Sequence, residues 1–267
     1  MDILDKIIVT KRIEVAERKA KMPVRDLERS MLYERDTVSM AAAITEAGSS
    51  GIISEFKRRS PSKGVINARS KVEDVIKGYD RAGCAGMSVL TDQGYFGGHV
   101  QDLVIARRVT TKPLLRKEFI IDEYQIIEAK AIGADLILLI AEVLSAAEVK
   151  NLAAVAQSLG MEVLLEMHTQ EQLPKVNYDL DIIGINNRNL KTFEVDLDAS
   201  IQLFDQLGDG FVKISESGLS ETKSLEKLRH AGFQGFLIGE NFMKTDDPGS
   251  ACRAFIEQLN QQKSIQA

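Results

Sequence analysis

The sequence predicts an α/β protein, a (β/α)8 TIM barrel with an N-terminal helical extension. Between residues 51 and 240, a short β-branched or aliphatic run recurs eight times, and a polar residue or a glycine follows each run. Amphipathic segments separate the runs. Buried parallel strands appear as unbroken apolar runs, joined by crossovers of about a dozen residues or more. A doubly wound open sheet is the competing topology. However, no GxGxxG motif follows the first run, and the polar residues do not gather at one switch point.

Strands and helices are expected to alternate along the chain. The expected strands are 52–53, 87–90, 114–115, 136–140, 163–165, 182–185, 212–214 and 236–238. The expected helices are 72–81, 100–108, 123–132, 146–158, 170–175, 199–206, 221–230 and 249–261. Ser145, Thr169 and Ser220 are candidate N-caps. Residues 1–47 have apolar positions at helical spacing, which predicts two or three helices packed on one end of the barrel; residues 48–267 are expected to form one catalytic domain.

Composition excludes several classes of protein. The 267 residues, 44% of them hydrophobic, suit one barrel of roughly 250 residues. A net charge of -5 gives no basic field for nucleic acid. Cys84 and Cys252 are too few for a disulfide framework or a zinc cluster, which favours a reducing cytoplasm. The start of the chain is charged, and no apolar run approaches the ~18 residues of a membrane span. We therefore expect a cytoplasmic protein with no nucleic-acid or membrane partner.

Charged side chains at the strand ends are candidates for acid and base chemistry, because a barrel gathers these ends at one mouth. The residues that close the runs are Glu55 with Lys57, Asp92, Lys117, Glu142, Glu166, Asn186 with Arg188, Glu216 and Gly239. Apolar walls and neighbouring cations can lower the pKa of a lysine such as Lys117 until it is an acid near neutral pH. Glu166 is the candidate base. The alternatives are a lysine extended from the rim and a glutamate in a structural ion pair.

Other loops suggest sites for an anion and for an aromatic group. Arg188 suits a carboxylate or a phosphate, and the glycines after the last two strands allow backbone amides to approach a phosphate. The glycine-rich loop at 92–99 presents Phe96, which either meets an aromatic ligand or pins the loop to the rim. Two alternatives remain for the other loops. The charged segment after the first strand is then simply solvated, and the asparagine-rich and glycine-containing loops after the later strands are only turns. Three histidines without HxH or HExxH spacing predict no metal site.

Five motifs in one order closely resemble those of the indole-3-glycerol phosphate synthase family. They are SEFKRRSPS at 54–62, SVLTD at 88–92 with YFGG at 95–98, LRKEFI at 115–120, GINNRNL at 184–190 and SESG at 215–218. The resemblance spans about residues 1 to 250, so no fused isomerase domain is expected. It implies a carboxy-lyase of tryptophan biosynthesis that needs no cofactor. Such an enzyme converts 1-(2-carboxyphenylamino)-1-deoxyribulose 5-phosphate to indole-3-glycerol phosphate, carbon dioxide and water.

The resemblance also implies roles for individual residues. Lys117 would be the general acid in ring closure, Glu166 would assist dehydration, and Lys57 would bind the substrate carboxylate. The implied catalytic set is Glu55, Lys57, Lys117, Glu166, Asn186 and Glu216. The implied substrate and phosphate ligands are Ser60, Arg188, Ser217, Gly218, Gly239 and Glu240; the last is expected either to point away or to bind through its amide alone. The implied anthranilate pocket is Pro61, Phe96, Phe119, Leu138 and Leu190.

Two other functions remain open from the sequence. One is a different phosphate-binding barrel, either an isomerase or an aldolase whose Schiff-base lysine would be Lys117 or Lys213. The other is an inactive barrel that serves as a partner protein.

Overall fold

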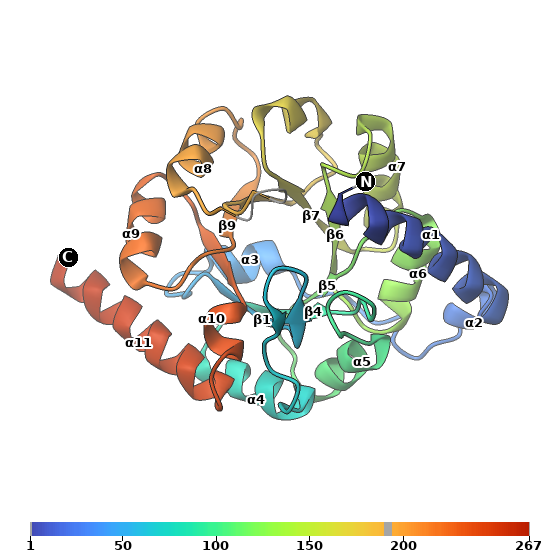
Figure 1. Ribbon diagram of the computed structural model, residues 1–267, viewed down its shortest axis with the longest axis horizontal. Helices are drawn as coiled ribbons and strands as arrows, with labels where there is room; N and C mark the ends of the chain where they lie inside the picture. Colours follow the sequence, from blue (N-terminus) through green and yellow to red (C-terminus); the bar gives the residue numbers. More distant parts are fainter. Residues whose placement is uncertain (1, 190–193, 267) are drawn as a thin grey trace.

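Eight parallel strands form a closed barrel in the computed structural model, which describes residues 2–189 and 194–266, with side chains up to residue 262 (Figure 1). Each strand pairs with the next in the chain, and the last pairs with the first. The strands are β1 (Ile52–Phe56), β4 (Gly86–Leu90), β5 (Leu114–Lys117), β6 (Leu136–Ile140), β7 (Glu162–Met167), β8 (Ile182–Asn186), β9 (Val212–Glu216) and β10 (Gly235–Ile238). The predicted TIM barrel is confirmed, and the open sheet is excluded.

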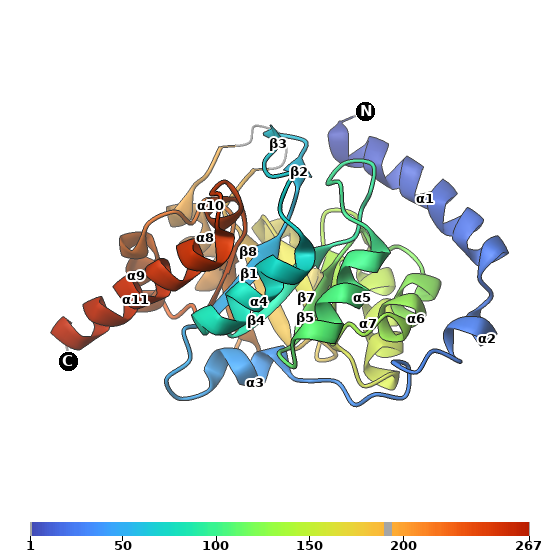
Figure 2. The same cartoon turned by 90° about the horizontal axis from the view of Figure 1, so that it is seen from below.

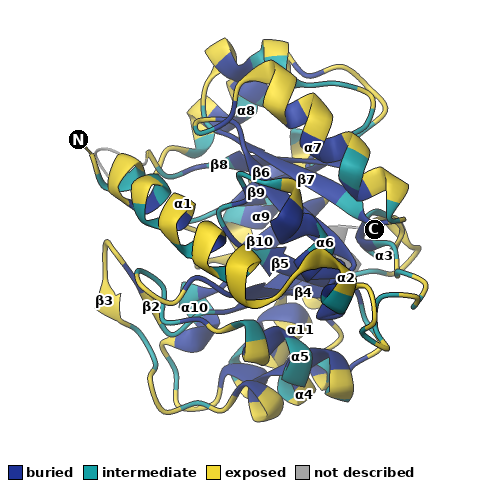
Figure 3. Cartoon of the chain, turned by 90° about the vertical axis from the view of Figure 1, so that its right-hand side faces the viewer, coloured by how far each residue is buried: buried dark blue, intermediate teal, exposed yellow. Residues whose placement is uncertain are grey.

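Helices enclose the barrel and leave their outer faces exposed (Figure 3). Before β1 lie α1 (Ile3–Lys21), α2 (Val24–Leu27) and α3 (Met40–Thr45). After it come α4 (Val72–Ala82), α5 (Val100–Val109), α6 (Glu123–Ala131), α7 (Ala146–Ser158), the 3-10 helix η1 (Gln170–Lys175), α8 (Leu197–Phe204), α9 (Thr222–His230), α10 (Glu240–Met243) and α11 (Pro248–Gln266). A small hairpin of β2 (Arg59–Ser60) and β3 (Gly64–Val65) follows β1. Within the described ranges, no helix is both long and apolar enough to cross a membrane.

The helix starts agree with the predicted caps at two of three positions. Ser145 accepts a hydrogen bond from the amide of Glu148 at 3.3 Å, and the Glu148 carboxylate accepts the Ser145 amide at 2.7 Å. This reciprocal pair satisfies donors that the first turn leaves free. Thr169 lies in the N-cap position of η1. The prediction for Ser220 is wrong, because α9 begins one residue later than such a cap requires, with Glu221 in the N-cap position.

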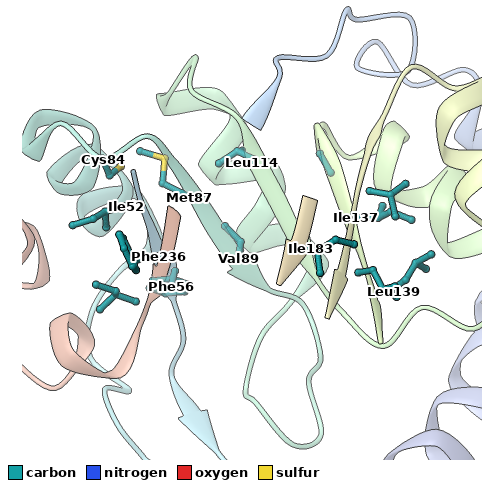
Figure 4. Packing of buried hydrophobic residues seen from close by; sticks show 14 of the residues in the cluster. Ile52, Phe56, Cys84, Met87, Val89, Leu114, Ile137, Leu139, Ile183 and Phe236 are labelled. Carbon is teal, nitrogen blue, oxygen red and sulfur yellow. The ribbon is translucent and has the colours of Figure 1, made fainter. Parts of the chain in front are cut away.

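Alternate residues of each strand face opposite sides of the barrel wall. Odd-numbered Ile137, Leu139 and Ile183 pack outward against the helices, in the large cluster that Figure 4 shows. Even-numbered Leu138 and Leu164 pack inside the barrel. Residues two positions apart on a strand face the same side of the barrel wall. Interior positions at the carboxyl ends of the strands therefore point into the mouth.

The N-terminal helices occupy both ends of the barrel, so the prediction that they pack on one end is wrong. Helix α1 lies at the mouth, on the side of the β2–β3 hairpin, and α3 lies at the opposite end (Figure 2). Ile3 and Ile7 of α1 line the cavity at the mouth. Met40 and Ile44 of α3 join the interior cluster at the bottom. The segment between α2 and α3 runs beneath the barrel to α3, at the end opposite the mouth (Figure 2).

Asp135, at the bottom of the barrel, fastens this connecting segment. Its carboxylate accepts Arg35 at 2.6 Å, Arg107 at 2.8 Å, and the backbone amides of Val38 and Leu114 at 2.9 and 2.8 Å. Asp135 is fully buried. Loss of its charge leaves two guanidinium groups without their partner in a region with little water.

We expect Asp135→Asn to lower the free energy of unfolding by about 3 to 5 kcal/mol, because the amide nitrogen faces donors that the carboxylate satisfied. Urea unfolding followed by circular dichroism measures this change. The control is Asp198→Asn, whose side chain is 72% exposed and pairs with Lys227 at the surface. The control should change stability by less than about 0.5 kcal/mol. Equal effects in the two variants would contradict the role of Asp135.

Candidate active site

A cavity of 440 Å³ lies at the carboxyl ends of the strands. Its lining includes every described residue of the three predicted sets: Glu55, Lys57, Lys117, Glu166, Asn186, Glu216, Ser60, Arg188, Ser217, Gly218, Gly239, Glu240, Pro61, Phe96, Phe119 and Leu138. Leu190 lies outside the described residues. Two other closing residues, Asp92 and Glu142, do not line the cavity. Asp92 is instead paired with Lys11, and Glu142 accepts a hydrogen bond from Gln172.

Lys117 is at the centre of the charged part of the cavity. Its Nζ lies 2.5 Å from Glu216 Oε2 and 3.1 Å from Glu166 Oε2. Asn186 donates its side-chain amide to Glu166 Oε1 at 3.0 Å, and His168 Nε2 lies 3.3 Å from the same oxygen. β5, β7, β8 and β9 thus each contribute one side chain to a single network. The ion pair weighed as an alternative for Glu166 is present, and its partner is Lys117.

The charges in this network shift one another's pKa. Burial lowers the pKa of Lys117, but the carboxylates of Glu216 and Glu166 outweigh burial and raise it. The expectation of a lowered lysine pKa is therefore wrong, because the neighbours are anions and not cations. Burial raises the pKa of Glu166, but Lys117 and His168 hold it well below its usual range. Burial, reinforced by Glu166, raises the pKa of Glu216 to about 7 although Lys117 opposes it.

Glu55 on β1 and Lys57, which directly follows β1, form a second charged pair. The distance between Glu55 Oε1 and Lys57 Nζ is 2.6 Å, and both side chains are largely buried. Gly239 faces this pair: a Cβ on it would lie 2.4 Å from Glu55 Oε1. Gly184 gives Glu216 similar room, since a Cβ there would lie 2.1 Å from Glu216 Oε1. The two glycines thus allow buried carboxylates to lie against the barrel wall.

The loop after β9 has an unusual backbone. Ser217 has a φ of 70°, the one positive φ among the described non-glycine residues, and Gly218 follows with a φ of 71°. Such a conformation costs a non-glycine residue on the order of 1 kcal/mol and is often found at functional sites. Asn187, which sequence reasoning did not select, stabilises it by donating to the Ser217 carbonyl at 2.8 Å and to Ser215 Oγ at 3.0 Å. Ser217 and Gly218 of this turn both line the cavity, and turns with such backbone conformations are common at phosphate sites.

Two cations lie near Glu240 at the same end of the cavity, and one of them, Arg188, lines it. Arg188 lies 3.7 Å and Lys63 3.8 Å from the carboxylate oxygens of Glu240. The carboxylate of Glu240 therefore faces these cations, contrary to the expectation that it points away. The amide of Glu240 lies at the start of α10, directly after Gly239. Two cations, two glycines and a helix start make this end suited to an anion.

The other end of the cavity is apolar. The rings of Phe96 and Phe119 lie 5.9 Å apart, and Pro61 and Leu138 also line this part. Helix α1 contributes Ile3, Leu4 and Ile7, which sequence reasoning missed. Their helical spacing was visible in the sequence, but nothing local indicated that this helix crosses the mouth.

Lys213 does not belong to the cavity. It lies on the outer side of β9, where its Nζ donates to the Leu207 carbonyl at 3.1 Å and lies over the Phe204 ring. The suggestion of a Schiff-base role for Lys213 is therefore wrong, because no substrate in the cavity reaches it. Among the residues that the structure describes, no three histidine, cysteine, aspartate or glutamate side chains are arranged to hold a metal.

The fold and the site define a class: a (β/α)8-barrel enzyme with buried acid and base groups between an apolar slot and an anion-binding end. The model of the indole-3-glycerol phosphate synthase family matches residues 4–255. An indole-3-glycerol phosphate synthase of Bacteroides thetaiotaomicron is 46% identical over 97% of this chain and 99% of its own length. That of Salinibacter ruber is 43% identical over 94% of each chain. The chain belongs to the indole-3-glycerol phosphate synthase family.

Solved structures of other barrels share the fold. The 3-hexulose-6-phosphate synthase of Salmonella typhimurium has a TM-score of 0.62 at 12% identity, over 79% of this chain and 99% of its own. The tryptophan synthase alpha subunit of Legionella pneumophila also has a TM-score of 0.62 at 12% identity, over 85% and 97%. At such identity the likeness concerns the fold alone.

Proposed function

We propose that the chain converts 1-(2-carboxyphenylamino)-1-deoxyribulose 5-phosphate to indole-3-glycerol phosphate, carbon dioxide and water, as a carboxy-lyase of tryptophan biosynthesis. One observation carries the proposal: Lys117 contacts Glu216 and Glu166 between an aromatic slot and an anion-binding end. The substrate has the same order of groups, with a carboxyphenyl ring, a polar middle and a phosphate. The cavity volume of 440 Å³ lies in the range of small-molecule sites.

Lys117 is the general acid in ring closure. A bond forms between the ring carbon that bears the carboxylate and C2 of the ribulose, and Lys117 gives its proton to the C2 oxygen. Carbon dioxide then leaves with its carbon–carbon bond electrons returning to the ring. Because its pKa is raised, Lys117 carries its proton before the reaction, which disfavours a Schiff-base nucleophile.

Dehydration completes the indole. Lys57 protonates the departing C2 hydroxyl, which leaves as water, and Glu166 accepts the proton that the pyrroline ring loses. The low pKa of Glu166 keeps it ionised and ready to accept that proton. Glu55 orients Lys57, with which it is paired at 2.6 Å. Lys57 also binds the substrate carboxylate before decarboxylation.

The remaining residues bind the substrate. Asn186 and Glu216 contact the hydroxyls of its middle section, and the phosphate is held by Ser60, Ser217, Gly218, Gly239, the amide of Glu240 and Arg188. The ring lies among Pro61, Phe96, Phe119, Leu138 and Leu190. The strained Ser217 backbone and the two nearby cations support the phosphate position. No cofactor takes part in this scheme.

We also propose how the chain is organised and where it works. Residues 1–47 act as an extension of a single catalytic domain formed by residues 48–267. The two cysteines are free and buried, in accord with a reducing cytoplasm.

Arg188→Ala should raise KM about tenfold to a hundredfold and leave kcat within about threefold, because the guanidinium binds the phosphate equally in the ground and transition states. Steady-state kinetics measure both values. Arg69→Ala, which removes a cation outside this cavity, should leave both unchanged. A fall in kcat with an unchanged KM would assign Arg188 to the chemistry instead.

The direct test gives purified protein the substrate in buffer containing a metal chelator and follows the rise of indole fluorescence. Fluorescence growth, with one carbon dioxide released per indole, supports the proposed reaction. Folded protein that releases neither product would refute it.

A further inference from the structure

Helix α1 buries a lysine within an apolar stripe. Ile3, Ile7, Lys11 and Val15 recur every four residues and therefore share one face of the helix. Ile3 and Ile7 line the cavity, whereas Lys11 is fully buried beyond it. Removing an ammonium from water is costly unless anions compensate for it, so the position of Lys11 requires partners.

Three carboxylates supply that compensation. Lys11 Nζ lies 2.7 Å from Glu14 Oε2, 2.9 Å from Asp92 Oδ2 and 2.9 Å from Glu118 Oε1. Two of the three N–H donors of the ammonium are hydrogen-bonded, to Glu14 and Asp92, and Glu118 adds a third ion pair. Asp92 follows β4 and Glu118 follows β5, so a single side chain of α1 joins two separate loops of the barrel.

The same two carboxylates fix the loops that carry the aromatic rings of the cavity. Asp92 Oδ1 accepts the backbone amides of Tyr95 at 2.7 Å and Phe96 at 3.1 Å. Glu118 Oε1 accepts the amide of Phe119 at 2.9 Å. Each of these carboxylates therefore links Lys11 to the backbone of a residue whose ring lines the cavity. A second bond joins α1 to the first loop, between the hydroxyls of Thr10 and Tyr95 at 3.0 Å.

The cluster remains charged. Burial lowers the pKa of Lys11, but Glu118 and Asp92 raise it further than burial lowers it. Burial raises the pKa of Glu118, whereas Lys11 and Arg116 lower it by more. Buried ions are stable only when their partners stay in close contact. The cluster is therefore a rigid connection between α1 and the two loops.

We propose that Lys11 is a positioning residue for the aromatic half of the substrate. It holds Ile3 and Ile7 of α1 opposite Phe96 and Phe119, so that the slot has the width of one planar ring. This inference rests on the proposed function, because it takes the carboxyphenyl ring as the occupant of the slot. Lys11 itself does not line the cavity and acts through the two loops.

The test compares Lys11→Met with Lys19→Met on the same helix. Lys19 also joins α1 to the barrel, through Asp122 at 2.7 Å, but its side chain is 46% exposed. We expect Lys11→Met to raise KM about tenfold with kcat within about threefold, and Lys19→Met to change neither. Calorimetry adds two phosphorylated ligands: the substrate reduced at C2, and 1-deoxyribitol 5-phosphate, which lacks the ring. Lys11→Met should weaken the first about tenfold and leave the second unchanged.

Two further variants test the inference in case Lys11→Met folds poorly. Lys11→Arg retains the charge and should recover most of the affinity for the ring-bearing ligand. Tyr95→Phe removes the Thr10 contact without leaving a buried charge unpaired, and should weaken the same ligand about threefold. If Lys11→Met yields no folded protein, an unchanged affinity in Tyr95→Phe overturns the inference.

The inference is also overturned if Lys11→Met binds both ligands as the unmodified protein does, or weakens both equally. The second pattern would mark a purely structural residue. Failure of the unmodified protein to form indole would instead refute the proposed function. The two failures are thus separated by one assay of the unmodified protein.

Discussion

Lys117→Ala is expected to reduce turnover by about a thousandfold while the protein still binds the substrate. The variant lacks the proton donor for the C2 oxygen, and no other described lysine contacts both Glu166 and Glu216. Single-turnover fluorescence measures the rate of indole formation, and calorimetry with the C2-reduced substrate measures affinity. We expect affinity to change by less than about tenfold, because the phosphate and ring contacts remain.

Lys227→Ala is the control, because this lysine pairs with Asp198 at the protein surface and not with buried carboxylates. It should have the kinetics of the unmodified protein. Turnover by Lys117→Ala within about tenfold of normal would remove Lys117 from the acid role. Circular dichroism of the variant is required in parallel, because the buried Glu216 and Glu166 lose their cation and protonate more easily.

Glu166→Gln is expected to slow indole formation by about a hundredfold or more, because it slows the dehydration step. Glutamine has the shape of glutamate but accepts no proton near neutral pH. Since decarboxylation precedes dehydration, carbon dioxide should appear in the first turnover at nearly the normal rate while indole fluorescence lags behind. Rapid quenching with separate assays of the two products makes the comparison.

Glu142→Gln is the matched control, because Glu142 follows the adjacent strand and lies outside the cavity, where it accepts a hydrogen bond from Gln172 at 2.7 Å. It should leave both products at their normal rates. If Glu166→Gln delays carbon dioxide and indole equally, Glu166 acts in ring closure or before it.

The sequence predicted much of the site because of a local property of strands. Side chains alternate across the barrel wall, so a polar residue at an interior position near a strand end must point into the mouth. Lys117, Glu166 and Glu216 fit this pattern, and each lines the cavity. Beyond the strand ends the pattern does not decide the direction of a side chain: Lys57 and Gly239 line the cavity, whereas Asp92 and Glu142 do not.

Electrostatic properties were less accessible from the sequence. Whether the pKa of Lys117 is raised or lowered depends on which charges lie within a few ångströms, and its partners Glu166 and Glu216 are 49 and 99 residues away in the chain. Sequence separation gives no such distance. The turn at Ser217 was similar, because its left-handed backbone is stabilised by a hydrogen bond from Asn187, which follows another strand.

By itself, the sequence determined the barrel, the order of its strands and the side of the wall that each strand residue faces, because hydrophobic periodicity and crossover length are local properties. Its motifs also identified the family. Only the tertiary structure decided that α1 crosses the mouth while α3 closes the far end, and that Lys11 of α1 joins the loops of Phe96 and Phe119. These arrangements depend on contacts between buried charges far apart in the chain, whose energies exist only once the fold brings them together.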